Sequence, residues 1–252
     1  YFKMLVDDIN ADGGIDGKTK IELVGYDAGS DPTEAISVYN RLVSLDKVSV
    51  VVGSTISNEM VPVAPIAASS KVPTLSTSLD ISIVTNNDGS TRDYNYILQL
   101  TSIQQGYATA YYLVEEMGYT DIAVIYNEGN AYCTAITKAL IECIENNYAD
   151  TVDLNVVTYG SAETDYSVFF GKAIDASTEV AYIGCQHETA EILGQFRGSH
   201  DIPVYGPNSY MPFITELGKV ASEEIHYFTG LDITNERFAE NNQRYREKFG
   251  HD

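Results

Sequence analysis

The sequence predicts an α/β fold with mostly parallel β-sheets. Short runs of β-branched residues recur along the 252 residues, and stretches with helical spacing of apolar side chains separate them. Strands that alternate with helices of about 10–15 residues are typical of βαβ units. One set of such units precedes Leu100 and a second set follows it. This repetition indicates two Rossmann-like lobes of similar architecture.

The predicted strands are short and bounded by polar or glycine-containing turns. Along the chain they are Ile21–Gly25, Val48–Val52, Thr74–Ser76, Ile122–Tyr126, Leu154–Thr158, Val180–Ile183, Val204–Tyr205 and Ile225–Thr229. The polar stretch 86–93 contains no apolar period and predicts a surface loop.

Apolar stripes and capping signals mark the predicted helices. Asp31 at the N-cap, Pro32 at the first helical position and Glu34 at the third predict one helix start. The residues that form the stripes are Ala35, Val38, Leu42 and Leu45, then Tyr107, Ala110, Tyr111 and Val114, and then Ile136, Leu140 and Cys143. The predicted helix stops are Gly118, Gly198 and Gly218.

The order of elements predicts that one strand of the first lobe lies upstream of residue 1. A helix over Phe2–Asn10 opens the sequence, with no strand before it. In a doubly wound sheet the first strand lies between the second and the third. Without it, the predicted strands Ile21–Gly25 and Val48–Val52 would each face a gap, with unpaired backbone groups. A further strand is likewise expected after the predicted helix Phe238–Gly250.

Composition excludes several classes of partner. The chain has 15 Lys and Arg against 36 Asp and Glu, a formal net charge of −21. Such an excess of acid opposes binding to phosphate backbones and to anionic membrane surfaces. We therefore expect no nucleic-acid partner. The longest apolar runs fall far short of the roughly 20 residues of a membrane helix.

The familiar catalytic, cofactor and metal motifs are missing from the sequence. It contains no GxGxxG, GxxxxGK[ST] or GxSxG. In 187–191 a zincin-like start lacks its second His, and position 12 of a calcium-like loop that begins at Asp8 is Thr19. Cys133, Cys143 and Cys185 show no CxxC spacing and are expected to be small buried side chains. We expect neither a metal nor a cofactor.

A series of segments resembles the type I periplasmic solute-binding proteins, and most of all the leucine/isoleucine/valine-binding proteins of ABC importers. The resemblance begins with 6–17 and 26–32 and includes the strand-to-helix glycine Gly53. It spans essentially the whole chain in the family's order, through the segments 51–57, 72–76, 105–106, 122–126 with Tyr132, 182–184 and 205–207. In that family two α/β lobes flank a cleft that holds the ligand. Ligands of open α/β sheets bind at the carboxyl ends of the strands, where helix N-termini favour a carboxylate.

The resemblance implies a set of ligand-binding residues. Ser57 aligns with the serine that binds the ligand carboxylate, and its alternative role is only to cap a helix over Asn58–Ala68. Ser78 aligns with a position that offers backbone groups to the ligand. Tyr132 aligns with an aromatic residue that closes on the ligand from the second lobe. The complete set is Ser57, Ser76, Ser78, Asp80, Tyr132, Gln186 and Asn208.

Three of these positions depart from the family pattern. Asn208 stands where amino-acid binders place a Glu that pairs with the ligand ammonium, and Gln186 stands where many relatives have Tyr. Asp80 falls where a Thr or Ser hydroxyl is usual. Either the ammonium site has moved toward Asp80, or the ligand is not an amino acid. The alternative for Asp80 is a solvated loop residue.

The resemblance implies a monomeric binding protein without enzymatic chemistry, which delivers a small polar ligand to the membrane permease of an ABC importer. It would reside in the periplasm or outside the cell, either free or lipid-anchored. Lobe one would comprise 1–99 and 232–252, and lobe two 100–231, with chain crossings near Leu100–Thr101 and Gly230–Leu231. The alternatives are a ligand-sensing receptor ectodomain of the same fold and, third, an enzyme on a doubly wound fold.

Overall fold

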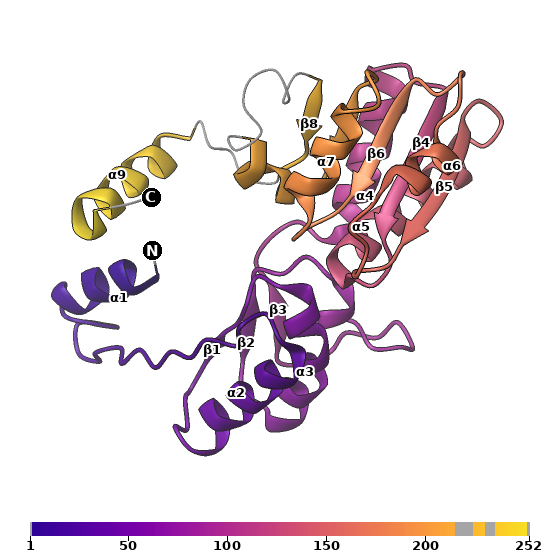
Figure 1. Cartoon of the computed structure of the whole chain (residues 1–252). Coiled ribbons are helices and arrows are strands. Elements are labelled where there is room, and N and C mark those ends of the chain that lie inside the picture. Colours follow the sequence, from indigo (N-terminus) through magenta and orange to yellow (C-terminus); the bar gives the residue numbers. More distant parts are fainter. Residues whose placement is uncertain (1, 215–223, 230–234, 251–252) are drawn as a thin grey trace.

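The computed structural model describes residues 2–214, 224–229 and 235–250. Two parallel sheets occupy different parts of the molecule (Figure 1), one built from strands before residue 100 and one from strands after it. The predicted stop at Gly218, the predicted crossing at Gly230–Leu231 and the predicted boundary at residue 232 lie outside the described residues.

The first sheet has three strands in the order β1-β2-β3. Val51 pairs with Thr74, and Thr74 pairs with Asn95, all in parallel register. Two helices and a 3₁₀ turn pack against this sheet around Met60, Val63 and Ile83. The elements of this part are α2 (Pro32–Ser44), β1 (Val51–Val52), α3 (Ser57–Ser70), β2 (Thr74–Ser76), η1 (Ile81–Ile83) and β3 (Asn95–Ile97).

Two strand predictions in this part need correction, and one strand was not predicted. Ile21–Gly25 forms no strand, and of Val48–Val52 only Val51–Val52 does. The reason is the lack of a pairing partner: β1 pairs with β2 on one side, and no described strand lies on its other side. A cavity of about 450 Å³ lies there instead, bounded by Val24–Ala28, α2, β1 and α3. The short strand Asn95–Ile97 was not predicted.

The second sheet has five strands in the order β5-β4-β6-β7-β8, all parallel. Its strands are β4 (Asp121–Asn127), β5 (Asp153–Tyr159), β6 (Val180–Gly184), β7 (Val204–Gly206) and β8 (Ile225–Tyr227). Its helices and turns are α4 (Ser102–Tyr111), a π-helical turn η2 (Tyr112–Glu116), α5 (Ala131–Asn147), α6 (Ser167–Ala173), α7 (Thr189–Arg197) and η3 (Asn208–Tyr210). All five strands predicted here are present, although β8 ends at Tyr227 rather than Thr229.

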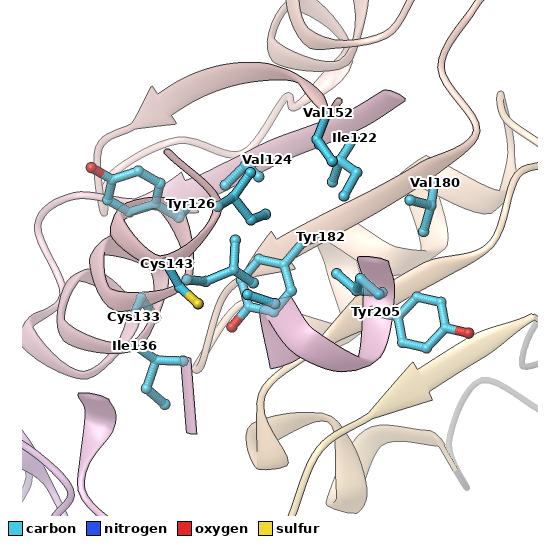
Figure 2. Close-up of a cluster of buried hydrophobic side chains, with 14 of the residues drawn as sticks. Ile122, Val124, Tyr126, Cys133, Ile136, Cys143, Val152, Val180, Tyr182 and Tyr205 are labelled. Atoms are coloured by element: carbon cyan, nitrogen blue, oxygen red, sulfur yellow. The ribbon is translucent and has the colours of Figure 1, made fainter. Parts of the chain in front are cut away.

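Hydrophobic clusters cover both faces of this sheet. Alternate β4 residues face opposite sides: Ile122 and Val124 belong to one cluster, and Ala123 and Ile125 to the other. The first cluster joins β4 and β6 to α5 through side chains such as Tyr182 and Ile136 (Figure 2). The three cysteines are free and buried, as predicted. In the part of the chain that the structure describes, no helix is long and apolar enough to cross a membrane.

Close packing of α4 on α5 depends on Gly106. A Cβ at this position would lie 2.6 Å from the Ile136 carbonyl oxygen and 2.7 Å from the Leu140 nitrogen. These are backbone atoms of α5, which cannot move away as a flexible side chain would. Only glycine therefore allows this approach, which holds the N-terminal half of α4 against α5.

The first and last described helices lie side by side, although they are far apart in the sequence (Figure 1). They are α1 (Phe2–Ala11) and α9 (Glu236–Phe249). The Arg244 guanidinium pairs with Asp8 at 2.5 Å, and the Lys248 ammonium pairs with Asp7 at 2.7 Å. The prediction of a helix over Phe2–Asn10 is confirmed.

Predicted helix ends agree with the structure in the described residues. The Asp31 side chain accepts a hydrogen bond from the Glu34 N–H at 2.8 Å, and Pro32 begins α2. Gly118 has a positive φ of 76° and follows Met117, the C-cap of the π-helical turn, and Gly198 is the C-cap of α7. The segment 86–93 lies in turns and bends, as expected of a loop.

Candidate functional site

A chain of serines lies at the carboxyl ends of β1 and β2. The hydroxyls of Ser57 and Ser78 are 2.7 Å apart. The Ser78 N–H donates to the Ser76 hydroxyl at 2.9 Å, and that hydroxyl donates to the Ser54 carbonyl at 3.2 Å. Ser57, Ser76 and Ser78 are all at least 99 % buried. The structure thus brings three of the seven predicted residues into one hydrogen-bonded group.

Ser57 is not the N-cap of α3. Ile56 occupies the N-cap position and Ser57 is the first helical residue. Its hydroxyl bonds to Ser78, on the segment after β2, instead of to its own helix. The helix N-terminus and the end of β2 are close enough for the side-chain contact to replace a local cap. The capping alternative for Ser57 is therefore wrong.

Asp80 caps the turn η1. Its Oδ1 accepts from the Ser82 N–H at 2.9 Å and from the Ser82 hydroxyl at 2.7 Å. The residue is only 9 % exposed, so the alternative of a solvated loop residue is wrong. Asp80 follows Ser78 by two residues in the chain, and its side chain is not part of the serine hydrogen-bonded group. Its position is compatible with a second role toward a ligand, because Ser82 contacts only Oδ1.

The second group of predicted residues lies in segments that follow strands of the five-stranded sheet. Tyr132, in the first turn of α5, donates its hydroxyl proton to the Asn208 side-chain oxygen. Burial raises the pKa of the Tyr132 phenol, so it remains a neutral donor at ordinary pH. The Gln186 oxygen accepts from the Asn130 amide at 2.9 Å, and Asn130 in turn caps α5.

Helices α3 and α5 meet at their N-termini. The Ala131 backbone N–H donates to Oδ1 of Asn58 at 2.9 Å. Asn58 follows Ser57 in the chain, and Ala131 precedes Tyr132. This hydrogen bond therefore places the serine group and the Tyr132–Asn208 pair at one junction. No hydrogen bond within the described residues joins Ser57 directly to Tyr132.

Two residues of this junction, Asn58 and Asn130, were missed by sequence reasoning. Asn130 had a signal, because an Asn after a strand and a glycine-containing turn is a typical N-cap. Asn58 had none, because its partner is a backbone group 73 residues away.

A cavity of about 690 Å³ opens next to this junction. Asn208 is the predicted site residue that lines it. The lining residues are Thr77, Ile97, Leu98, Gln99, Leu100, Asn208 and Thr229. The cavity thus lies between the ends of β2 and β3 on one side, and η3 and the residues after β8 on the other. It includes the predicted chain crossing at Leu100.

The chemistry offered at the junction is mostly that of neutral hydrogen-bonding groups. Hydroxyls come from the serines and Tyr132, amides from Asn208 and Gln186, and one carboxylate from Asp80. Two helix N-termini, each the positive end of a helix dipole, face the same region. Such a set can hold a small polar molecule in a fixed orientation. Within the described ranges, no cluster of three or more His, Cys, Asp or Glu side chains could hold a metal ion.

Parallel sheets whose carboxyl ends face a shared cavity define a class of ligand-binding α/β protein. A family model described as periplasmic binding protein matches residues 2–252. The chain belongs to this family.

Relatives and solved structures agree with the family assignment. The chain is 28% identical over 197 residues to the Leu/Ile/Val-binding protein of Escherichia coli (strain K12), which is 77% of this chain and 51% of that protein. It is 28% identical over 195 residues to the Leu/Ile/Val-binding protein of Citrobacter freundii, covering 76% and 50%. The chain therefore spans about half the length of these curated relatives.

Among solved structures, the branched-chain amino acid transporter substrate-binding protein of Streptococcus pneumoniae, in complex with isoleucine, superposes with a TM-score of 0.80 at 25% identity. The match covers 99% of this chain and 71% of that one. A leucine-binding protein of Thermotoga maritima gives a TM-score of 0.79 at 20% identity, covering 99% and 72%. The predicted fold class, an α/β periplasmic binding protein with parallel sheets, is confirmed.

Proposed function

We propose that this chain is part of an extracytoplasmic solute-binding protein of an ABC importer, and that it binds an amino acid or a related small polar compound between two lobes. The observation that carries the proposal is the junction of the α3 and α5 N-termini beside the 690 Å³ cavity. The family and its branched-chain amino acid-binding relatives support the ligand class. The protein has no enzymatic chemistry in this proposal.

The serine group is suited to a ligand carboxylate. Ser57 and Ser78 share one hydrogen bond between their hydroxyls, so only one of the two donates to the other. A ligand carboxylate bound here would accept a hydrogen bond from each hydroxyl. The free N–H groups and positive dipole end of α3 add to this attraction. Ser76 would act by holding the Ser78 backbone in place.

The opposite end of the ligand would meet Asp80, Tyr132, Gln186 and Asn208. Asn208 can accept a hydrogen bond from an ammonium group but cannot neutralise its charge. Asp80 supplies the negative charge on this side, through the oxygen that does not bond to Ser82. A ligand with both an anionic and a cationic group fits this distribution.

Two lobes would close on the ligand by a hinge motion. We propose 1–99 and 232–252 for lobe one and 100–231 for lobe two. The separate sheets and the pairing of α1 with α9 support this division. The importer's permease would be the membrane partner of this protein. The binding protein itself would be a monomer in the periplasm or at the cell exterior, either free or lipid-anchored.

Mass spectrometry of co-purified small molecules and a thermal-shift screen test the proposal. The panel comprises amino acids, small organic acids, purines and sugars. A ligand at about 100 times its Kd adds about 2.7 kcal/mol to the free energy of unfolding. A panel that moves no melting temperature would contradict the proposed function, as would chemical conversion of a bound compound.

A further inference from the structure

A buried polar network lies at the carboxyl ends of β4 and β5. One oxygen of Glu188, Oε1, accepts two hydrogen bonds: from the Tyr159 hydroxyl at 2.6 Å and from the Asn127 amide at 2.7 Å. Asn127 ends β4 and Tyr159 ends β5, whereas Glu188 immediately precedes α7. Asn127 and Tyr159 are 97 % and 98 % buried, so neither donor has water as an easy alternative partner.

The network continues through Asn127 into the turn before α5. Oδ1 of Asn127 accepts from the Gly129 N–H and from the Ser161 hydroxyl, both at 3.0 Å. The Asn127 side chain therefore bonds to its own turn through Oδ1 and to Glu188 through its amide nitrogen. Because the turn leads directly into the Asn130 cap, the orientation of the α5 N-terminus depends on it.

The same loop that carries Glu188 also carries Gln186. The Gln186 oxygen accepts from Asn130, so the loop and the turn are joined at two points: Glu188 to Asn127 and Gln186 to Asn130. Two contacts between the same segments fix both their separation and their relative rotation. The next two residues in the chain after Asn130 are Ala131 and Tyr132. Ala131 forms a hydrogen bond with Asn58, and Tyr132 forms one with Asn208.

Glu188 carries its charge without an ion-pair partner among the described residues. Burial acts to raise the pKa of its carboxyl, but the hydrogen bonds from Tyr159 and Asn127, together with backbone hydrogen bonds in the same loop, outweigh burial and hold the pKa below its usual range. Its partners are neutral donors, which suits a carboxylate that orients side chains.

We propose that Glu188 is a positioning residue of the ligand site: its carboxylate fixes the turn 127–130, and through it the α5 N-terminus with Tyr132, against the loop that carries Gln186. The consequence for affinity rests on the proposed function, whereas the effect on the turn does not. Glu188 acts through Asn127 and Asn130 rather than by contact with the ligand.

Hydrogen exchange of the ligand-free protein tests the effect on the turn. In Glu188→Ala the Gly129 and Cys133 amides should exchange about tenfold faster, because the contact that anchors the turn is lost. Glu188→Gln keeps an oxygen acceptor and should stay close to wild type. The matched control is Glu191→Gln, which removes the same charge from an exposed residue of α7. Tyr159→Phe, which removes one donor and keeps the ring, provides a second test if Glu188→Ala does not fold.

Calorimetry with a ligand found in the screen tests the effect on affinity. Glu188→Ala should bind about tenfold more weakly, with Glu188→Gln restoring most of the loss and Glu191→Gln unchanged. Wild-type exchange rates in both Glu188→Ala and Tyr159→Phe would overturn the proposal. A second outcome would also overturn it: Glu188→Gln binds cationic ligands as weakly as Glu188→Ala does, but binds other ligands like wild type. That pattern indicates direct contact between Glu188 and the ligand. If wild type binds nothing, the proposed function fails, and the exchange rates still decide the role of Glu188.

Discussion

Asn58 and Ala131 form a hydrogen bond between the N-termini of α3 and α5, two helices that follow strands of different sheets. Oδ1 of Asn58 accepts from the Ala131 N–H at 2.9 Å. The donor is one of the first N–H groups of α5, which have no partner within their own helix. The bond therefore satisfies a helix end and joins the two halves of the site at the same time.

Asn58→Ala should weaken ligand binding without lowering the stability of either sheet. A neutral hydrogen bond contributes about 1 kcal/mol, or about fivefold in affinity when it forms only in the closed arrangement. Asn58→Asp keeps an oxygen at the same place and should retain the contact. Small-angle scattering of the ligand-free variants checks the reason: Asn58→Ala should be more extended. Equal dimensions and equal Kd for Asn58→Ala and wild type would contradict this role.

Ser57→Ala should lower affinity more strongly. A hydrogen bond to a charged ligand group is worth about 1.5–3 kcal/mol, whereas loss of the Ser57–Ser78 bond costs the fold only about 1 kcal/mol. Because Ser57 is not an N-cap, no capping energy is lost. Calorimetric Kd values and denaturant unfolding separate the two effects. Ser69→Ala, on the exposed side of the same helix, is the control, and an unchanged Kd in Ser57→Ala would remove Ser57 from the ligand site.

Asp80→Asn should discriminate between ligands by charge. The amide keeps the oxygen that accepts from Ser82, so η1 should remain capped while the negative charge disappears. Cationic ligands should therefore lose more affinity than neutral ligands of the same size. The measurement is a panel of Kd values for wild type and variant. An equal change for both classes of ligand would limit Asp80 to capping η1.

Gly106→Ala should destabilise the fold, and Gly194→Ala should not. At Gly106 a methyl group would collide with the α5 backbone, and overpacking of this kind costs about 1–3 kcal/mol. At Gly194, in α7, no atom lies within 4 Å of the added Cβ, so alanine should stabilise the helix by about 0.5–1 kcal/mol. Urea unfolding of both variants measures the difference. Stability changes of the same sign would show that α4 can shift away from α5.

Stability should fall at alkaline pH because of buried tyrosines. Burial raises the pKa of Tyr132, Tyr182 and Tyr210 above the ordinary value of 10.0. The unfolded chain loses these protons first, so the stabilisation is complete below about pH 10 and is lost as pH rises from there. The expected slope is about 1.4 kcal/mol per pH unit for each tyrosine that stays protonated in the fold. Denaturant unfolding between about pH 8 and 11 measures it. A flat profile across that range would mean that these phenols ionise without unfolding.

The sequence by itself determined the fold class, most helices and all strands of the second sheet. The central strands β4 and β6 are buried on both faces and carry continuous apolar runs, which is a local signal. Capping residues such as Asp31 act within four residues of the chain, and they too could be read directly. Gly118 and Gly198 also lie at helix ends, as their positions in the sequence predicted.

Only the tertiary structure decided what depends on partners distant in sequence. Ile21–Gly25 has strand-like composition, but a strand needs a neighbour with which to pair, and none is present among the described residues. Ser57 resembles a helix cap in sequence, yet its hydroxyl forms a hydrogen bond with the Ser78 hydroxyl instead of with its own helix. The contacts of Asn58 with Ala131 and of Glu188 with Asn127 span 73 and 61 residues. No local pattern encodes such contacts, because the geometry that creates them arises only when strands and helices pack together.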